Sequence, residues 1–194
     1  LIWYLQIITH NNEVDSCKVR YGGVDYSLKI NDKMKIEGNP GNCLVITDNG
    51  YRLGIKDNCL EKEYQISCDK DFKTNLLYRE TAGGTIFVSS RTNSAGAGGL
   101  TSEKVGARCF RTGNTCDYEG SLWAVSALQR DEKEVSEYTP YLIALASSNE
   151  KYFPSAFLSF TTGKSEQYER IIKQYRKFRN KKWNQGRNGR TTKQ

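Results

Sequence analysis

Six cysteines constrain the fold of this 194-residue chain more than any other sequence feature. They are Cys17, Cys43, Cys59, Cys68, Cys109 and Cys116. None of them forms a C-x-x-C pair, and the chain has a single histidine, so we expect neither a bound metal nor any other cofactor. An even number of cysteines in a β-rich chain predicts three disulfides. The alternative is a cytosolic protein with six buried, reduced thiols.

Pairing of the cysteines is not determined by their number. Closeness along the chain favours the bridges Cys59–Cys68 and Cys109–Cys116, which leaves Cys17 to pair with Cys43. Disulfides persist outside the reducing cytosol. We therefore expect an extracellular or cell-surface protein whose first half is held in shape by these bridges.

The first half of the chain has the pattern of short β-strands separated by turns. Residues 24–30 read VDYSLKI, in which apolar and polar residues alternate as in a strand with one buried face. Residues 43–55 place Asn49-Gly50 between two apolar runs, the signature of a tight type I′ hairpin. Residues 1–92 are therefore predicted to form a small disulfide-clipped antiparallel β-sandwich or barrel.

The second half changes to helical periodicity. Residues 93–108 begin with a glycine-rich stretch of small residues, which predicts a linker. Beyond it, apolar residues recur every three or four positions, and Pro140 and Pro154 are typical of helix starts. We predict a stack of about four short α-helices, a helical hairpin array, over 109–179. The predicted fold class is α+β, with a basic disordered tail over 180–194.

One segment resembles a known repeat. Residues 117–128 read DYEGSLWAVSAL, and after a polar gap residues 141–146 read YLIALA. This pattern resembles a repeat of the α/α-toroid proteins, the superfamily of terpenoid cyclases, prenyltransferase β-subunits and complement thioester domains. The resemblance covers residues 117–185 and implies inner-ring helices. The acidic, thioester and zinc-binding motifs of these proteins are missing, so it implies no catalytic residue.

The net charge of +7 is concentrated at the C-terminal end. Ten basic residues and no acidic ones lie within residues 170–194, leaving 19 basic and 22 acidic residues before them. Such a tail could neutralise the phosphates of a nucleic acid or another anionic polymer. The alternative is a solvated basic helix face. The candidate anion-binding residues are Arg176, Lys177, Arg179, Lys181 and Lys182.

The sequence favours a secreted or cell-surface binding or structural module without enzymatic activity, with a protein or a glycan as its partner. Asp117, Tyr118, Glu119 and Trp123 are the candidate ligand-facing residues. Two carboxylates beside aromatic rings are also typical of enzymes that act on polysaccharides, which is the alternative function.

No segment predicts a membrane-spanning helix. Residues 1–8 form an apolar run that is too short to cross a bilayer. This run is expected to be either the remnant of an export segment or a first strand.

Overall fold

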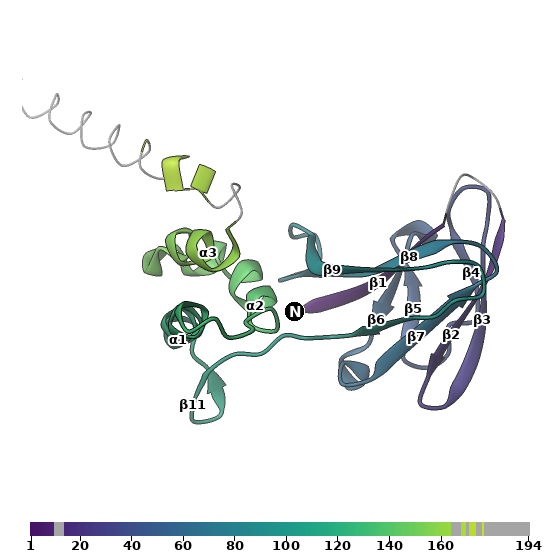
Figure 1. Cartoon of the computed structure of the whole chain (residues 1–194), viewed down its shortest axis with the longest axis horizontal. Coiled ribbons are helices and arrows are strands. Elements are labelled where there is room, and N and C mark those ends of the chain that lie inside the picture. Colours follow the sequence, from purple (N-terminus) through teal and green to yellow (C-terminus); the bar gives the residue numbers. More distant parts are fainter. Residues whose placement is uncertain (10–13, 164–167, 170, 174–175, 177–194) are drawn as a thin grey trace, which may run out of the picture. The chain divides into compact units, whose positions relative to one another are not determined.

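The computed structural model describes residues 1–9, 14–163, 168–169, 171–173 and 176. Two compact units divide the chain, Leu1–Ala107 and Arg108–Gln194. The first unit is built from β-strands and the second contains the α-helices (Figure 1). The predicted α+β fold class is confirmed.

The first unit consists of two five-stranded antiparallel sheets. One sheet has the strand order β5 (Leu44–Thr47), β6 (Arg52–Ile55), β1 (Ile2–Thr9), β8 (Phe72–Arg79) and β9 (Phe87–Ala95). The other has the order β10 (Thr101–Lys104), β7 (Glu63–Cys68), β2 (Asp15–Tyr21), β3 (Val24–Ile30) and β4 (Ile36–Gly38). The pair of sheets is sandwich-like, and the sheets do not close into a barrel.

The core of this unit follows from the alternation of side chains along the strands. In β2 every second residue is buried and the residues between are exposed. Residues 1–8 contribute to the central strand β1, which lies between β6 and β8, so one of the two expectations for this apolar run is realised. Its Trp3 is buried and lies opposite Tyr78 of β8 and Ile55 of β6.

The hairpin predicted around Asn49-Gly50 is present, but its turn is longer than a type I′ turn. Thr47 pairs with Arg52, so four residues connect β5 to β6, and three of them form η1 (Asp48–Gly50). Asp48 and Asn49 have φ values of 50° and 57°. Aspartate and asparagine tolerate this left-handed backbone. Asp48 also forms a salt bridge with Arg52 across the turn, at 2.5 Å.

Much of the segment predicted as a linker, residues 93–108, belongs to the sheets. Its first residues end β9, and Thr101–Lys104 form β10. The glycine-rich part is a turn in which the Gly99 N–H donates to the Gly96 carbonyl at 2.8 Å. Both strands lie at sheet edges. The side chains of β10 do alternate between buried and exposed, but all four of its residues are polar, so no apolar period marks the segment as a strand in the sequence.

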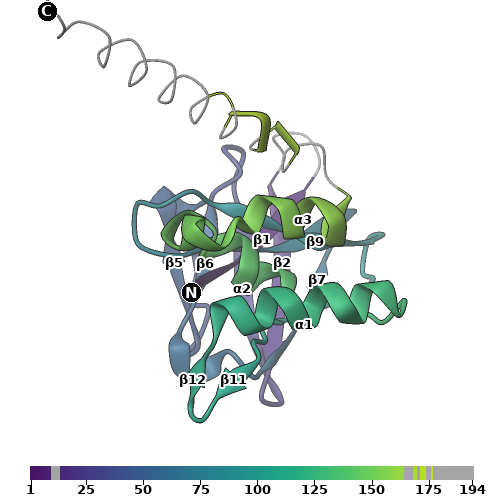
Figure 2. The same ribbon diagram turned by 90° about the vertical axis from the view of Figure 1, so that its left-hand side faces the viewer.

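Over residues 108–163, the second unit has three α-helices and a small hairpin (Figure 2). The helices are α1 (Tyr118–Arg130), α2 (Thr139–Ala144) and α3 (Pro154–Thr162), and the 3₁₀ segment η3 (Ser147–Tyr152) precedes α3. The hairpin consists of β11 (Arg111–Thr112) and β12 (Thr115–Cys116). Residues 168–169, 171–173 and 176 are also helical. About four short helices were predicted here, and the structure agrees.

The resemblance to α/α-toroid repeats is wrong. The three helices have 13, 6 and 9 residues, and the described part of the chain is dominated by β-sheets. The expected second helix of the repeat, α2, ends at Ala144 and gives way to η3. Phe153 has a left-handed backbone, with φ of 51°, and separates η3 from α3. These interruptions prevent the long paired helices that a toroid repeat requires.

All six cysteines form disulfides, as predicted, but two of the predicted pairings are wrong. The bridges are Cys17–Cys68, Cys43–Cys59 and Cys109–Cys116. Cys17 lies directly opposite Cys68 on the neighbouring strands β2 and β7, with their Cα atoms 4.0 Å apart. Cys43 precedes β5 and Cys59 follows β6, so their bridge closes that hairpin. Strand register determines the first of these pairs, whereas the β5–β6 hairpin and the short η2 segment (Asp57–Cys59) that follows it bring the second pair together.

Candidate functional site

The start of α1 is determined by Asp117, one of the four candidate ligand-facing residues. Its carboxylate accepts hydrogen bonds from the Gly120 N–H at 3.0 Å and from the Thr112 hydroxyl at 3.2 Å. A Cβ atom at Gly120 would lie 2.9 Å from the same carboxylate. The glycine therefore makes room for the cap. Asp117 is an N-cap that joins α1 to the β11–β12 hairpin.

Tyr118 is a packing residue rather than a ligand-facing one. Its side chain is buried, and its hydroxyl donates a hydrogen bond of 2.7 Å to the Leu142 carbonyl. Its ring lies against Tyr141 and Tyr152, at centroid distances of 5.8 and 6.4 Å. Burial raises the pKa of the Tyr118 phenol, and the nearby Tyr141 adds to the rise. Tyr118 therefore anchors α2 to α1.

The other two candidates, Glu119 and Trp123, face outward. They belong to a stripe along α1 that also contains Ala127 and Arg130, and all four side chains are exposed. Their spacing of four, four and three residues places them on one side of the helix. Trp123 is the most prominent of them, with 62% of its surface exposed. The structure thus separates the four predicted residues into two that stabilise the helix and two that are available for contact.

Trp123 is part of an aromatic surface shared by α1 and α3. Its ring meets the ring of Phe157 edge-on, with the centroids 4.8 Å apart. Phe160 lies one helical turn beyond Phe157 and is 59% exposed. We call Trp123, Phe157 and Phe160 the aromatic face. Exposed aromatic side chains that gather in one place mark an interaction surface more often than isolated ones do.

The aromatic face was only partly predictable. The large apolar residues of α3 are Phe157, Leu158 and Phe160, three of its nine positions, and their spacing alone does not show which of them face the core. Leu158 alone takes the fully buried position between them. A nine-residue helix has one core-facing stripe, so a surplus of large apolar residues is the signal that identifies the exposed pair.

Among the residues of the first unit that the structure describes, the side chains of Asp15, Cys17 and Cys68 lie close enough together to hold an ion. Both sulfurs are bonded to each other, so they are not available as thiolate ligands. The Asp15 carboxylate is 2% exposed, and its oxygens have no hydrogen-bond partner within the described residues. The arrangement offers a cation one carboxylate only.

A buried polar network connects the two sheets of the first unit. Glu103 of β10 is 4% exposed. One of its carboxylate oxygens accepts hydrogen bonds from the Thr74 hydroxyl of β8 at 2.7 Å and from the Asn93 amide of β9 at 2.9 Å. The hydroxyls of Thr74 and Thr101 are 3.1 Å apart. This network satisfies a buried carboxylate and fixes the position of β10 against the other sheet.

The candidate anion-binding residues lie mostly outside the described residues. Arg176 is helical and exposed. Lys177, Arg179, Lys181 and Lys182 are not described, so an anion-binding tail stays a prediction. Among the described residues, no helix combines the length and apolar character that crossing a membrane requires.

Comparison with known proteins adds no relative from which a site could be transferred. Neither protein-family models, nor curated proteins, nor solved structures gave a match to this chain. The aromatic face and the disulfides are therefore the features of this chain that point to a function.

Proposed function

We propose that this protein is a binding module without enzymatic activity that works outside the reducing cytosol, secreted or at a cell surface. Its aromatic face would engage a protein partner. The observation that carries the proposal is the exposure of Trp123 and Phe160 on two helices that pack against each other. The three disulfides support the location, because such bridges persist in oxidising compartments.

The chemistry of the aromatic face favours a protein over a glycan. Trp123 meets Phe157 edge-on and has Ala127 as its neighbour one turn along α1. Sugar platforms combine flat ring faces with many hydrogen-bonding groups, whereas the other members of the exposed stripe of α1 are Glu119, Ala127 and Arg130, of which two carry such groups. Tryptophan, phenylalanine and arginine are enriched at protein interfaces.

The proposal of a non-enzymatic module is supported by the use of Asp117. A pair of carboxylates acting as acid and base needs both groups available to the substrate. Asp117 already accepts two hydrogen bonds as the N-cap of α1. Its neighbour Glu119 has no second carboxylate on the exposed stripe with which to form such a pair.

A photo-crosslinking experiment tests the proposal. We would introduce the photo-reactive residue p-benzoylphenylalanine at position 123 or 160 of the full chain. The protein would be expressed in cells that export it, so that its disulfides can form. Val88, an exposed apolar residue of the first unit, is the matched control position. We expect protein adducts from positions 123 and 160 and none from 88. Adducts with glycan alone, or no adducts from either helix position, would overturn the proposed function.

Thiol labelling tests the proposed location. In protein isolated without reductant, we expect no cysteine to react with a maleimide after denaturation, because all six are bridged. Six labelled cysteines would place the protein in a reducing compartment and overturn this part of the proposal.

A further inference from the structure

We infer that the partner at the aromatic face is a second copy of this chain, bound through α1 in an antiparallel pair about a two-fold axis. The inference rests on the proposed function and names its partner. It is derived from the order of the four residues on the exposed stripe of α1.

The exposed stripe is complementary to itself when the second helix runs in the opposite direction. In a two-fold interface, each contact between residues i and j occurs twice, once in each direction. Glu119 then faces the partner's Arg130, and Trp123 faces the partner's Ala127. The Glu119–Arg130 pair is centred between Ala124 and Val125 and the Trp123–Ala127 pair at Val125, half a residue apart on the same turn of the helix. One docking position therefore satisfies both pairs at once.

The two kinds of pair serve different purposes. A large ring opposite a small side chain allows two helices to approach closely. Their axes can then lie about 8–10 Å apart, the distance typical of packed helices. Each Trp123 ring is already held by Phe157 of its own chain, so little side-chain freedom is lost on docking. Phe160, one helical turn from Phe157 on α3, adds exposed apolar area.

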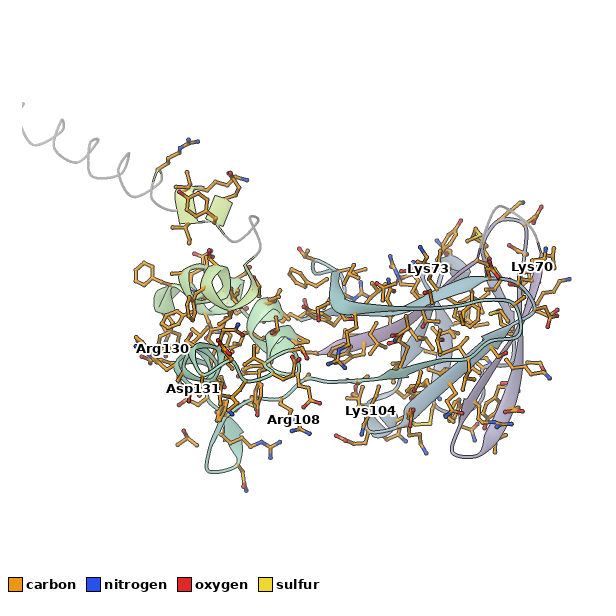
Figure 3. The ribbon with its side chains drawn as sticks, in the orientation of Figure 1. Lys70, Lys73, Lys104, Arg108, Arg130 and Asp131 are labelled. Carbon is orange, nitrogen blue, oxygen red and sulfur yellow. A yellow bond between two sulfur atoms is a disulfide. The ribbon has the colours of Figure 1, made fainter. Side chains whose placement is uncertain are left out.

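The charges at the two ends of the stripe determine the direction of pairing. Glu119 and Arg130 are eleven positions apart, about 16 Å along the helix. Lys151 is near Glu119, and neither Glu119 nor Arg130 forms a salt bridge within the described part of the chain. Arg130, labelled in Figure 3, is the last residue of α1. A parallel pair would set Glu119 against Glu119 and Arg130 against Arg130, which is repulsive.

The dimer is expected to be weak. One helix of 13 residues with an additional phenylalanine buries less area than the usual 1,200–2,000 Å² of a stable interface. We therefore expect a dissociation constant on the order of 10 µM, so that association depends on local concentration.

Charge reversal with sedimentation equilibrium of the full chain tests the geometry. Glu119→Lys places a lysine opposite the partner's Arg130, and Arg130→Glu sets two glutamates together. Each single variant is expected to weaken dimerisation at least about tenfold. The double variant Glu119→Lys/Arg130→Glu restores both pairs and is expected to dimerise within about threefold of the natural chain. The control variants are Glu61→Lys and Lys133→Glu, which make the same charge changes at exposed residues outside the stripe. They should leave dimerisation unchanged.

Each outcome decides for or against the inference. A chain that stays monomeric up to hundreds of micromolar overturns it, and so does a dimer that is insensitive to both charges. Loss in the single variants without recovery in the double variant overturns the antiparallel arrangement. In all three cases, an adduct at position 123 with a different protein would leave the proposed function intact. Near-ultraviolet circular dichroism of every variant verifies that the fold is retained.

Discussion

The hydroxyl of Tyr118 on α1 donates a hydrogen bond of 2.7 Å to the main-chain carbonyl of Leu142 on α2. This bond joins two helices that are separated by a loop of eight residues. It satisfies a carbonyl near the C-terminal end of α2, where the helix itself provides no partner.

Tyr118→Phe removes this bond and leaves the Leu142 carbonyl buried without its partner. We expect the free energy of unfolding of the helical unit to fall by about 1–2 kcal/mol. Urea denaturation followed by circular dichroism measures the change. Tyr168→Phe, at an exposed tyrosine, is the matched control and should change the stability by less than about 0.5 kcal/mol.

Asp117 provides a second test, because its structural role as an N-cap contrasts with a role in binding. Asp117→Ala removes the acceptor for the Gly120 N–H and should cost about 1 kcal/mol. Asp117→Asn keeps an acceptor oxygen and should recover most of that loss. Equal losses in the two variants, in the same urea experiment, would contradict the capping role.

Tyr64 makes the first unit sensitive to alkaline pH. Burial, helped by the nearby Tyr21, raises the pKa of Tyr64 to about 12 from an ordinary value of 10. The folded state therefore keeps its proton at pH values where the unfolded chain has lost it. The stability from this group is complete below pH 10 and is lost as the pH rises to about 12. Tyr64→Phe should flatten the fall in stability between these pH values, although it also removes the hydrogen bond to the Cys59 carbonyl.

Thr74→Val tests the polar network between the sheets. Valine keeps the shape of threonine but removes the hydroxyl that donates to Glu103. Because Glu103 is buried, we expect a loss of about 1–3 kcal/mol. Ser27→Ala, at an exposed position of β3, controls for the loss of a hydroxyl in a strand. A loss in Thr74→Val no larger than in this control would show that the network contributes nothing to stability.

The disulfides are expected to differ in their contributions. The span between the bridged residues is 51 for Cys17–Cys68 and 16 for Cys43–Cys59. Loop-closure entropy then predicts that Cys17–Cys68 stabilises the folded state by about 4 kcal/mol and Cys43–Cys59 by about 3 kcal/mol. Paired cysteine-to-alanine variants, compared by urea denaturation, should lose stability in that order. Peptide mapping without reductant should recover both bridges, and a Cys59–Cys68 peptide would contradict the structure.

Local patterns predicted the elements that depend on neighbouring residues. The alternation in residues 24–30 predicts β3, and Pro140 and Pro154 mark the starts of α2 and α3. These signals arise within one turn or one strand. They are therefore visible without knowledge of what the element packs against.

The predictions that failed depend on contacts between distant segments. The pairing of Cys17 with Cys68 follows from the register of β2 and β7, which lie 42 residues apart along the chain at their nearest ends. The toroid resemblance relied on the composition and helix spacing of residues 117–185, which do not reveal that Tyr118 is buried and Trp123 is exposed. Which of two nearby aromatic residues faces the core is decided by the packing of α2 and α3.

The arrangement of the bridges has a consequence for the order in which they can form as the chain emerges during synthesis. Cys43 and Cys59 can join as soon as their hairpin has emerged, whereas Cys17 must wait for Cys68. Cys109 and Cys116 lie together in the last half and need no earlier residue. Since no bridge crosses from one half to the other, oxidation of each half is a separate event. An isomerase would be needed chiefly in the first half, where the Cys43–Cys59 bridge is nested within the span of Cys17–Cys68.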